Sequence, residues 1–135
     1  MQPNKHRTWA EIDLDALEHN YNVARQKIGP GVKYLGVVKA DAYGHGSVQV
    51  SRVLEELGAD YLAVSSLDEA MELRAGGIHM PILILGHTPP ERVEELLRYH
   101  ITQTVTCEAK ALEYSAEAVR CGGTLKVHIK VETGM

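Results

Sequence analysis

Residues 34–46 of the chain read YLGVVKADAYGHG. The first part, Tyr34–Lys39, is a short apolar run of the kind that forms a strand, and it carries a lysine at its C-terminal end. The second part contains glycines at 44 and 46, which are typical of a turn. An apolar strand followed by a polar turn is the unit that the rest of the chain repeats.

Four further runs of this kind follow. They are Tyr61–Val64, Ile82–Leu85, Thr102–Val105 and Leu125–Val131. The five runs end at residues 39, 64, 85, 105 and 131, a nearly regular spacing that leaves room for one helix and two short loops each time. The spacing predicts a repeated βα unit.

Helix signals lie between the predicted strands. Three segments carry apolar residues at helical spacing: Leu14, Leu17, Tyr21 and Ala24 after Asp13; Val50, Val53, Leu54 and Leu57 before Gly58; and Ala109, Leu112, Ala116 and Val119 before Gly122. Ser66 and Glu69 have the spacing of a capping box, and so do Thr88 and Glu91, with a proline, Pro89, at the first helical position. We therefore expect helices to begin at these positions.

Alternating strands and helices favour a parallel sheet, either as an open doubly wound sheet or as a β/α barrel. A leucine-rich solenoid is excluded because its consensus is absent from the chain. In Leu125–Val131, apolar residues alternate with Lys126, His128 and Lys130. This alternation fits a barrel wall with a polar lumen, but for this strand alone it is more typical of a half-exposed antiparallel strand.

The length of the chain bears on the choice. A TIM-type (β/α)8 barrel needs about 250 residues, whereas this chain has 135. We expect an α/β protein in which residues 1–135 form one partial barrel of about five βα units, as the N-terminal portion of a longer protein or as a truncated product.

Composition excludes several classes of function. Hydrophobic residues make up 44% and charged residues 24%, which are the values of a folded globular domain. The net charge is −4 and phenylalanine is absent, so neither nucleic acid nor an anionic membrane is an expected partner. Cys107 and Cys121 lack the spacing of a metal site, and no signal peptide or membrane-spanning run is present, so we expect a cytoplasmic protein with no metal.

Lys39 is the first candidate for chemistry. The C-terminal edge of a parallel β/α fold is where ligands bind, and an amine partly removed from water there can attack a carbonyl to form an imine. Gly44 and Gly46 allow the backbone to approach a ligand closely, and Tyr43 offers a ring and a hydroxyl. The bland alternative, a lysine that only ends a strand and reaches water, is the more common one for an isolated lysine. A dinucleotide fingerprint is rejected because Gln49 stands where its third glycine belongs.

Three segments together resemble the alanine racemase family. They are VVKADAYGHG at 37–46, WAEIDL at 9–14 and KVETGM at 130–135. The resemblance implies a pyridoxal 5'-phosphate enzyme built on a β/α barrel. It implies that Lys39 holds the cofactor and acts as one of two acid/base groups, and that Tyr43 contacts the cofactor phosphate. Lys130 matches a lysine that is carbamylated in some members and orients an arginine near the substrate; the alternative is a lumen lysine paired with an acid.

The same resemblance implies interconversion of L- and D-alanine, which supplies D-alanine for peptidoglycan, by a homodimer whose second base is a tyrosine from the partner's C-terminal domain. Residues 8–13 would form a strand that packs with that C-terminal β domain. Glu132 departs from the aspartate that is usual in the family. Because these further parts are not expected within 135 residues, we expect the isolated chain to be inactive. The alternatives are a pyridoxal-phosphate decarboxylase or a non-catalytic cofactor-handling protein of the same barrel type, and a non-enzymatic fragment with open sheet edges.

Overall fold

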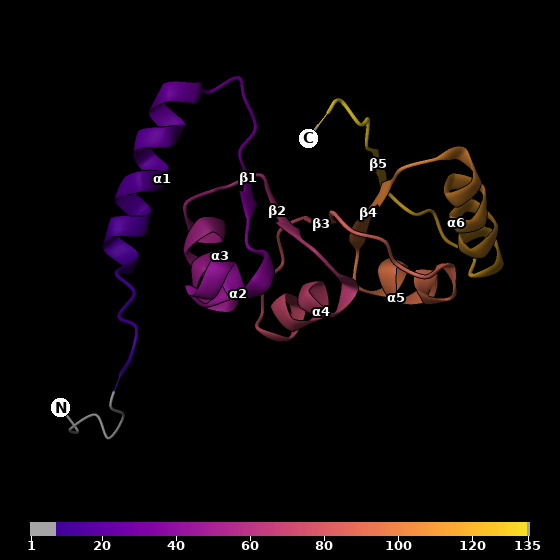
Figure 1. Cartoon of the computed structure of the whole chain (residues 1–135), viewed down its shortest axis with the longest axis horizontal. Coiled ribbons are helices and arrows are strands. Elements are labelled where there is room, and N and C mark those ends of the chain that lie inside the picture. The colour runs from indigo at the N-terminus through magenta and orange to yellow at the C-terminus, as the bar shows by residue number, and fades with distance from the viewer. Residues whose placement is uncertain (1–7, 135) are drawn as a thin grey trace.

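The computed structural model describes residues 8–134, in which strands and helices alternate (Figure 1). The elements in chain order are α1 (Leu14–Ile28), β1 (Leu35–Val37), α2 (Lys39–Gly44), α3 (Ser47–Glu56), β2 (Tyr61–Val64), α4 (Leu67–Ala75), β3 (Ile82–Ile84), the 3-10 helix η1 (Pro90–Arg92), α5 (Val93–Arg98), β4 (Ile101–Val105), α6 (Glu108–Arg120) and β5 (Val127–Ile129). All five predicted strands are confirmed, with ends that differ by at most two residues.

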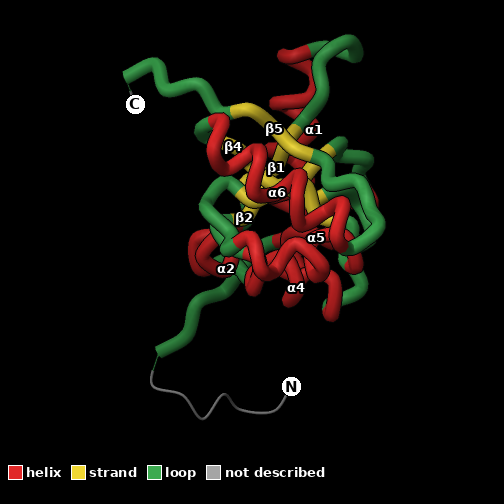
Figure 2. Tube along the Cα trace, turned by 90° about the vertical axis from the view of Figure 1, so that its right-hand side faces the viewer, coloured by secondary structure: helices red, strands yellow, loops and turns green. Residues whose placement is uncertain are grey.

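The strands form one sheet in which every pair is parallel and the order is β1-β2-β3-β4-β5. Spatial order equals chain order throughout, whereas a doubly wound sheet reverses its strand order part-way. Figure 2 shows helices α2, α4 and α5 together below the strands. This architecture is that of the N-terminal part of a β/α barrel, and within residues 8–134 the ring is not closed, since β1 pairs only with β2 and β5 only with β4.

The antiparallel interpretation of residues 125–131 was wrong. β5 lies parallel to β4, with Thr104 opposite His128 and Val105 opposite Ile129. The alternation that suggested an antiparallel strand has another cause. His128 and Lys130 line a hollow at the edge of the sheet. No helix follows β5 within residues 8–134, and the apolar residues of β5 and of the segment after it are exposed, with Ile129 at 80%.

The hydrophobic core lies between the sheet and the helices. Leu62, Val64, Ile82 and Ile84 alternate along β2 and β3 and are fully buried. α4 contacts both strands and buries its own apolar residues against them. Full burial of one such side chain contributes about 1.5–3 kcal/mol, so this layer supplies much of the driving force for folding.

Two of the three predicted apolar helix stripes are confirmed. Tyr21 of α1 is buried against Tyr34, with ring centroids 4.8 Å apart, and Val50 and Leu54 of α3 are buried. The prediction that the apolar stripe of the last helix, α6, packs into the core was wrong. Leu112 and Val119 are 64% and 75% exposed, because α6 packs the opposite face, with Tyr114 and Ala118, against the protein.

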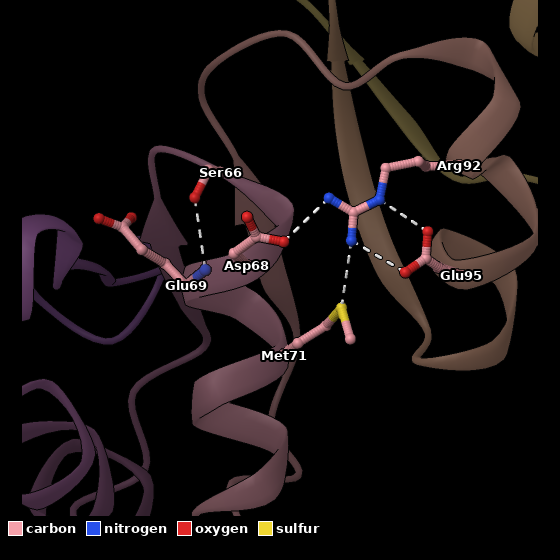
Figure 3. A network of polar contacts seen from close by, with 6 residues as sticks. All are labelled: Ser66, Asp68, Glu69, Met71, Arg92 and Glu95. Atoms are coloured by element: carbon pink, nitrogen blue, oxygen red, sulfur yellow. Dashed lines mark hydrogen bonds and ion pairs between the residues drawn. The ribbon is translucent and has the colours of Figure 1, made fainter.

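The two predicted capping boxes have different outcomes. The hydroxyl of Ser66 accepts a hydrogen bond from the backbone N–H of Glu69, as expected at the start of α4 (Figure 3). Thr88 does not cap a helix: η1 begins at Pro90, after Pro89, without a side-chain cap. The backbone of Thr88 is engaged by Tyr114 instead, whose hydroxyl donates to the Thr88 carbonyl at 2.6 Å.

The guanidinium of Arg92 ties α4 to α5 on the outside of the fold (Figure 3). It donates to both carboxylate oxygens of Glu95, at 2.7 and 2.9 Å, and to Asp68 at 2.9 Å. These bonds raise the pKa of Arg92 and lower that of Glu95, with the Arg92–Glu95 hydrogen bond as the largest cause of each shift. Because the pairs lie at the surface, their contribution to stability is small.

Residues 8–13 have no regular secondary structure up to Asp13, whose carboxylate caps α1 by accepting from the N–H groups of Asp15 and Ala16. The strand expected at 8–13 concerns pairing with a further domain and stays a prediction. Met135, which ends the third family-like segment, lies outside the described residues. None of the helices in residues 8–134 is long and apolar enough to cross a bilayer.

Candidate active site

A hollow of about 630 Å³ lies at the C-terminal end of the strands. Lys39, Ser65 and Gly86 follow β1, β2 and β3, and Lys130 follows β5. Because parallel strands end at the same edge of the sheet, these residues meet there. The lining consists of Lys39, Ser65, Leu83, Leu85, Gly86, Thr104, His128, Ile129 and Lys130. Two of the three predicted site residues, Lys39 and Lys130, therefore line one hollow.

Tyr43 does not join them. Its side chain is 62% exposed and is not part of the lining of the hollow. Tyr43 stands at the end of the turn that leaves Lys39. Its contact with a phosphate group stays a prediction.

The turn after Lys39 has an unusual backbone. Ala40, Asp41, Ala42 and Tyr43 all have positive φ, between 50° and 57°, with ψ between 35° and 53°. They form one turn of left-handed helix, a conformation that costs an L-residue roughly 1–2 kcal/mol. The sequence predicted a turn here only from Gly44 and Gly46, which follow these residues. Four residues with side chains share the left-handed conformation, so other contacts must hold the turn in place.

Hydrogen bonds within the segment supply part of that support. The N–H of Ala42 donates to the carbonyl of Val38 at 3.0 Å, and the N–H of Gly46 donates to the carbonyl of Asp41 at 3.0 Å. The carboxylate of Asp41 accepts from the N–H of Ser47 at 2.7 Å, at the start of α3. The turn is thus anchored to the strand before it and to the helix after it.

Glu69 supplies the remaining support from a different helix. One oxygen of its carboxylate accepts from the backbone N–H of Ala40 at 2.9 Å. The other accepts from both the N–H and the hydroxyl of Ser65, each at 2.7 Å. Partial burial acts to raise the pKa of Glu69, but hydrogen bonds from Ser65, Ala40 and Ser66 outweigh it, so the pKa lies below its ordinary value. Glu69 therefore stays ionised at neutral pH.

The capping-box spacing identifies Glu69 but only one of its partners, the backbone of Ser66. Its spacing from Ser66 predicts that its side chain returns to the start of α4. In the structure it passes on to Ser65 and to Ala40, the residue directly after Lys39. The bond to Ala40 spans 29 residues and had no local signal in the sequence.

Gly86 brings two loops of the hollow together. A Cβ at this position would lie 2.4 Å from the carbonyl oxygen of Ser65, closer than real contacts allow. The carbonyl of Gly86 accepts from the amide nitrogen of Gln103 at 2.8 Å, and the Gln103 side chain is fully buried. The absence of a side chain at 86 therefore allows the loops after β2 and β3 to approach each other this closely.

The hollow combines polar and apolar side chains. His128, one of its lining residues, packs against Tyr61 with ring centroids 5.7 Å apart. None of the described residues that line the hollow is acidic, while Lys39, Lys130 and His128 can each carry positive charge. The hollow has the size of a small-molecule site. It is suited to an anionic ligand that presents a carbonyl to an amine.

Comparison with known proteins agrees with this geometry. Residues 12–135 match the family model described as alanine racemase, N-terminal domain. The chain belongs to the alanine racemase family. It is 48% identical, over 127 residues, to the alanine racemase of Desulfovibrio desulfuricans, an alignment that covers 94% of this chain and 34% of that protein. The chain thus spans about a third of the length of the curated alanine racemases it matches.

Solved structures extend the comparison to the fold. The alanine racemase of Clostridium difficile 630 superposes with a TM-score of 0.92 at 44% identity, covering 97% of this chain and 34% of that one. A histidine racemase from Leuconostoc mesenteroides superposes with a TM-score of 0.75 at 29% identity, covering 84% of this chain and 30% of that one. Racemases with different substrates in their names therefore share this part of the alanine racemase fold.

Proposed function

We propose that this chain supplies the cofactor-bearing part of a pyridoxal-phosphate-dependent alanine racemase that interconverts L- and D-alanine. One observation carries the proposal: Lys39, in the segment that resembles the cofactor-lysine signature, opens onto the same hollow as Lys130 and His128. Membership of the alanine racemase family supports the activity. The roles of the individual side chains are part of the proposal.

The residues around the hollow fit pyridoxal phosphate. Its aldehyde needs an amine, which Lys39 offers, and its phosphate needs hydrogen-bond donors, which the His128 ring can supply. Leu83 and Leu85 provide apolar surface for a ring. When bound, the cofactor supplies an electron sink that lowers the cost of removing the α-proton of an amino acid.

Within this scheme, Lys39 has two tasks. It holds the cofactor through Nζ, and after release from it the same Nζ takes or returns a proton at the α-carbon on one face of the substrate. Inversion needs a second group on the opposite face. The family resemblance assigns that group to a tyrosine of a partner subunit, so we propose a homodimer and expect residues 1–135 alone not to racemise alanine.

Lys130 and Tyr43 have supporting roles in the proposal. We propose that Lys130, as a free or carbamylated lysine, orients a group near the substrate, since it lines the hollow with Lys39. We propose that Tyr43 contacts the cofactor phosphate, which requires its exposed ring to be covered in the complete site. In the cell we place the protein in the cytoplasm, where its D-alanine would serve peptidoglycan synthesis.

The test uses the full-length product of the gene that carries this segment. Purified protein is incubated with pyridoxal phosphate, reduced with borohydride and digested, and the modified peptide is identified by mass spectrometry. We expect label on Lys39 and conversion of L-alanine to D-alanine. Label on a different lysine would refute the proposed anchor, and release of carbon dioxide in place of the enantiomer would favour a decarboxylase. L-serine and L-histidine are assayed in parallel, because racemases named for alanine and for histidine share this part of the fold.

A further inference from the structure

We propose that Glu69 is a positioning residue for Lys39: its carboxylate ties together the backbone on two sides of the hollow and so fixes the place of the Lys39 amine. The inference rests on the proposed function, in which Lys39 is the cofactor lysine. It adds a residue of α4 that does not itself line the hollow.

The geometry of the clamp is specific. Glu69 lies in the first turn of α4, which follows β2. Its Oε1 accepts from the N–H of Ala40, the first residue of the left-handed turn. Its Oε2 accepts from the N–H and the hydroxyl of Ser65, which lines the hollow. One carboxylate therefore joins the ends of β1 and β2 where the candidate site opens.

The left-handed turn explains why such a clamp is needed. Residues 40–43 hold a conformation that L-residues disfavour. Other hydrogen bonds anchor the later part of the turn, at Asp41 and Ala42. The first N–H of the turn, at Ala40, is bonded to Glu69. Loss of this bond would free the turn at the point where Lys39 enters it.

The chemistry of the clamp calls for a carboxylate. Three donors converge on two oxygens, and a carboxylate can accept all of them because it has no hydrogen of its own. A glutamine has the same shape but only one accepting oxygen. Its NH2 group would face either the Ala40 N–H or the two donors of Ser65. Glu69→Gln therefore removes one side of the clamp with little change in volume.

A merely structural role makes a different prediction. If Glu69 only stabilised the start of α4, its replacement would lower the folded fraction and leave the behaviour of folded molecules unchanged. A positioning role requires that folded molecules capture the cofactor more slowly. The rate of capture by Lys39, normalised to the folded fraction, separates the two.

The experiment uses the full-length protein with Glu69→Gln, Glu69→Ala and the matched control Glu72→Gln, which changes an exposed glutamate of the same helix. The folded fraction is measured by circular dichroism. Capture of pyridoxal phosphate is followed by absorbance and by borohydride trapping at Lys39. Hydrogen exchange is measured in peptides that cover residues 38–44 and 63–70.

We expect both Glu69 variants to capture the cofactor roughly tenfold to a hundredfold more slowly per folded molecule, with faster exchange in both peptides and with Glu72→Gln unchanged. Parental capture rates, or losses that only follow the folded fraction, would overturn the inference. If the parent itself shows no label on Lys39, the proposed function fails. Unchanged exchange in the two peptides of the Glu69 variants would overturn the clamp independently of that outcome.

Discussion

Lys39 follows β1 and Lys130 follows β5, the two edge strands of the sheet, and both side chains line the same hollow. A flat five-stranded sheet would hold its edge strands roughly 19 Å apart. The sheet therefore curves so that residues 91 positions apart in sequence face one space. This curvature, rather than any local motif, assembles the candidate site.

Replacement of Lys39 should abolish cofactor attachment. We expect Lys39→Ala to show no borohydride-trapped label and no measurable racemase activity, because no amine would remain at the end of β1. The measurement is mass spectrometry of the reduced protein, together with an assay for D-alanine. Lys33→Ala, an exposed lysine just before β1, is the control and should behave as the parent does. Undiminished label in Lys39→Ala would remove the basis of the assignment.

Replacement of Lys130 should weaken the binding of an anionic ligand. We expect Lys130→Met to lower the affinity for pyridoxal phosphate or for substrate by roughly tenfold, the size of effect typical for one charge-assisted contact. Lys126→Met is the matched control, since Lys126 belongs to the same strand region but lines a separate hollow at the opposite end of the sheet. Equal losses in both variants would show that general positive charge, and not the position of Lys130, is responsible.

Gly86 should tolerate no side chain. We expect Gly86→Ala to lower the free energy of unfolding by about 1–3 kcal/mol, because the new Cβ would overlap the Ser65 carbonyl oxygen and force the β2 and β3 loops apart. Urea unfolding followed by circular dichroism measures the change. Gly31→Ala serves as the control, since a Cβ there meets nothing within 4 Å. An unchanged free energy of unfolding in Gly86→Ala would mean that the loops after β2 and β3 can move apart without loss of stability.

Arg74 should stabilise the opposite end of the sheet. Its guanidinium donates to the carbonyls of Ile78, Met80, Tyr99 and His100. We expect Arg74→Met to lower the free energy of unfolding by about 1–3 kcal/mol, since the replacement leaves half-buried carbonyls without donors. Arg98→Met, at an exposed position, is the control. Thermal or urea unfolding decides the matter, and equal stability of the two variants would contradict the prediction.

Acid should destabilise the parent more than Glu69→Gln. The pKa of Glu69 in the folded protein lies below its ordinary value of 4.5, because hydrogen bonds to the carboxylate outweigh the effect of burial. A carboxyl with a lowered folded-state pKa contributes stability above its unfolded pKa, and this contribution is lost as the pH falls through the folded one. The difference in stability between parent and variant should therefore shrink below about pH 4.5. A difference in stability between parent and variant that stays constant from pH 7 to pH 3 would contradict the lowered pKa of Glu69.

The repeat of strands and helices could be predicted because apolar runs and their spacing are local properties of the chain. Tyr61–Val64 is an example whose ends agree with the structure. The face of α6 could not be predicted, because the stripe of Leu112 and Val119 is as regular as a buried one and only the neighbouring elements decide which face packs. The direction of β5 depended in the same way on its neighbour β4.

In the candidate site, too, local features could be predicted and features that depend on distant elements could not. Lys39 could be found because it ends a strand in a distinctive segment, and Lys130 because it resembles a family position. Their shared hollow depends on the curvature of the whole sheet. The left-handed turn at 40–43 had no signal, since alanine and tyrosine ordinarily avoid it. The partner of Glu69 lies in another βα unit, beyond the reach of any local pattern.

The left-handed turn also has a consequence for the order in which the molecule matures. A right-handed helical turn can form early because its residues prefer that conformation locally. Ala40–Tyr43 adopt a left-handed conformation that they disfavour, so contacts with other elements must stabilise it. The residue that bonds to Ala40 comes from α4, which is synthesised later. We therefore expect the sheet and its helices to assemble first. The amine of Lys39 would then reach its final position in the hollow only at the end of folding.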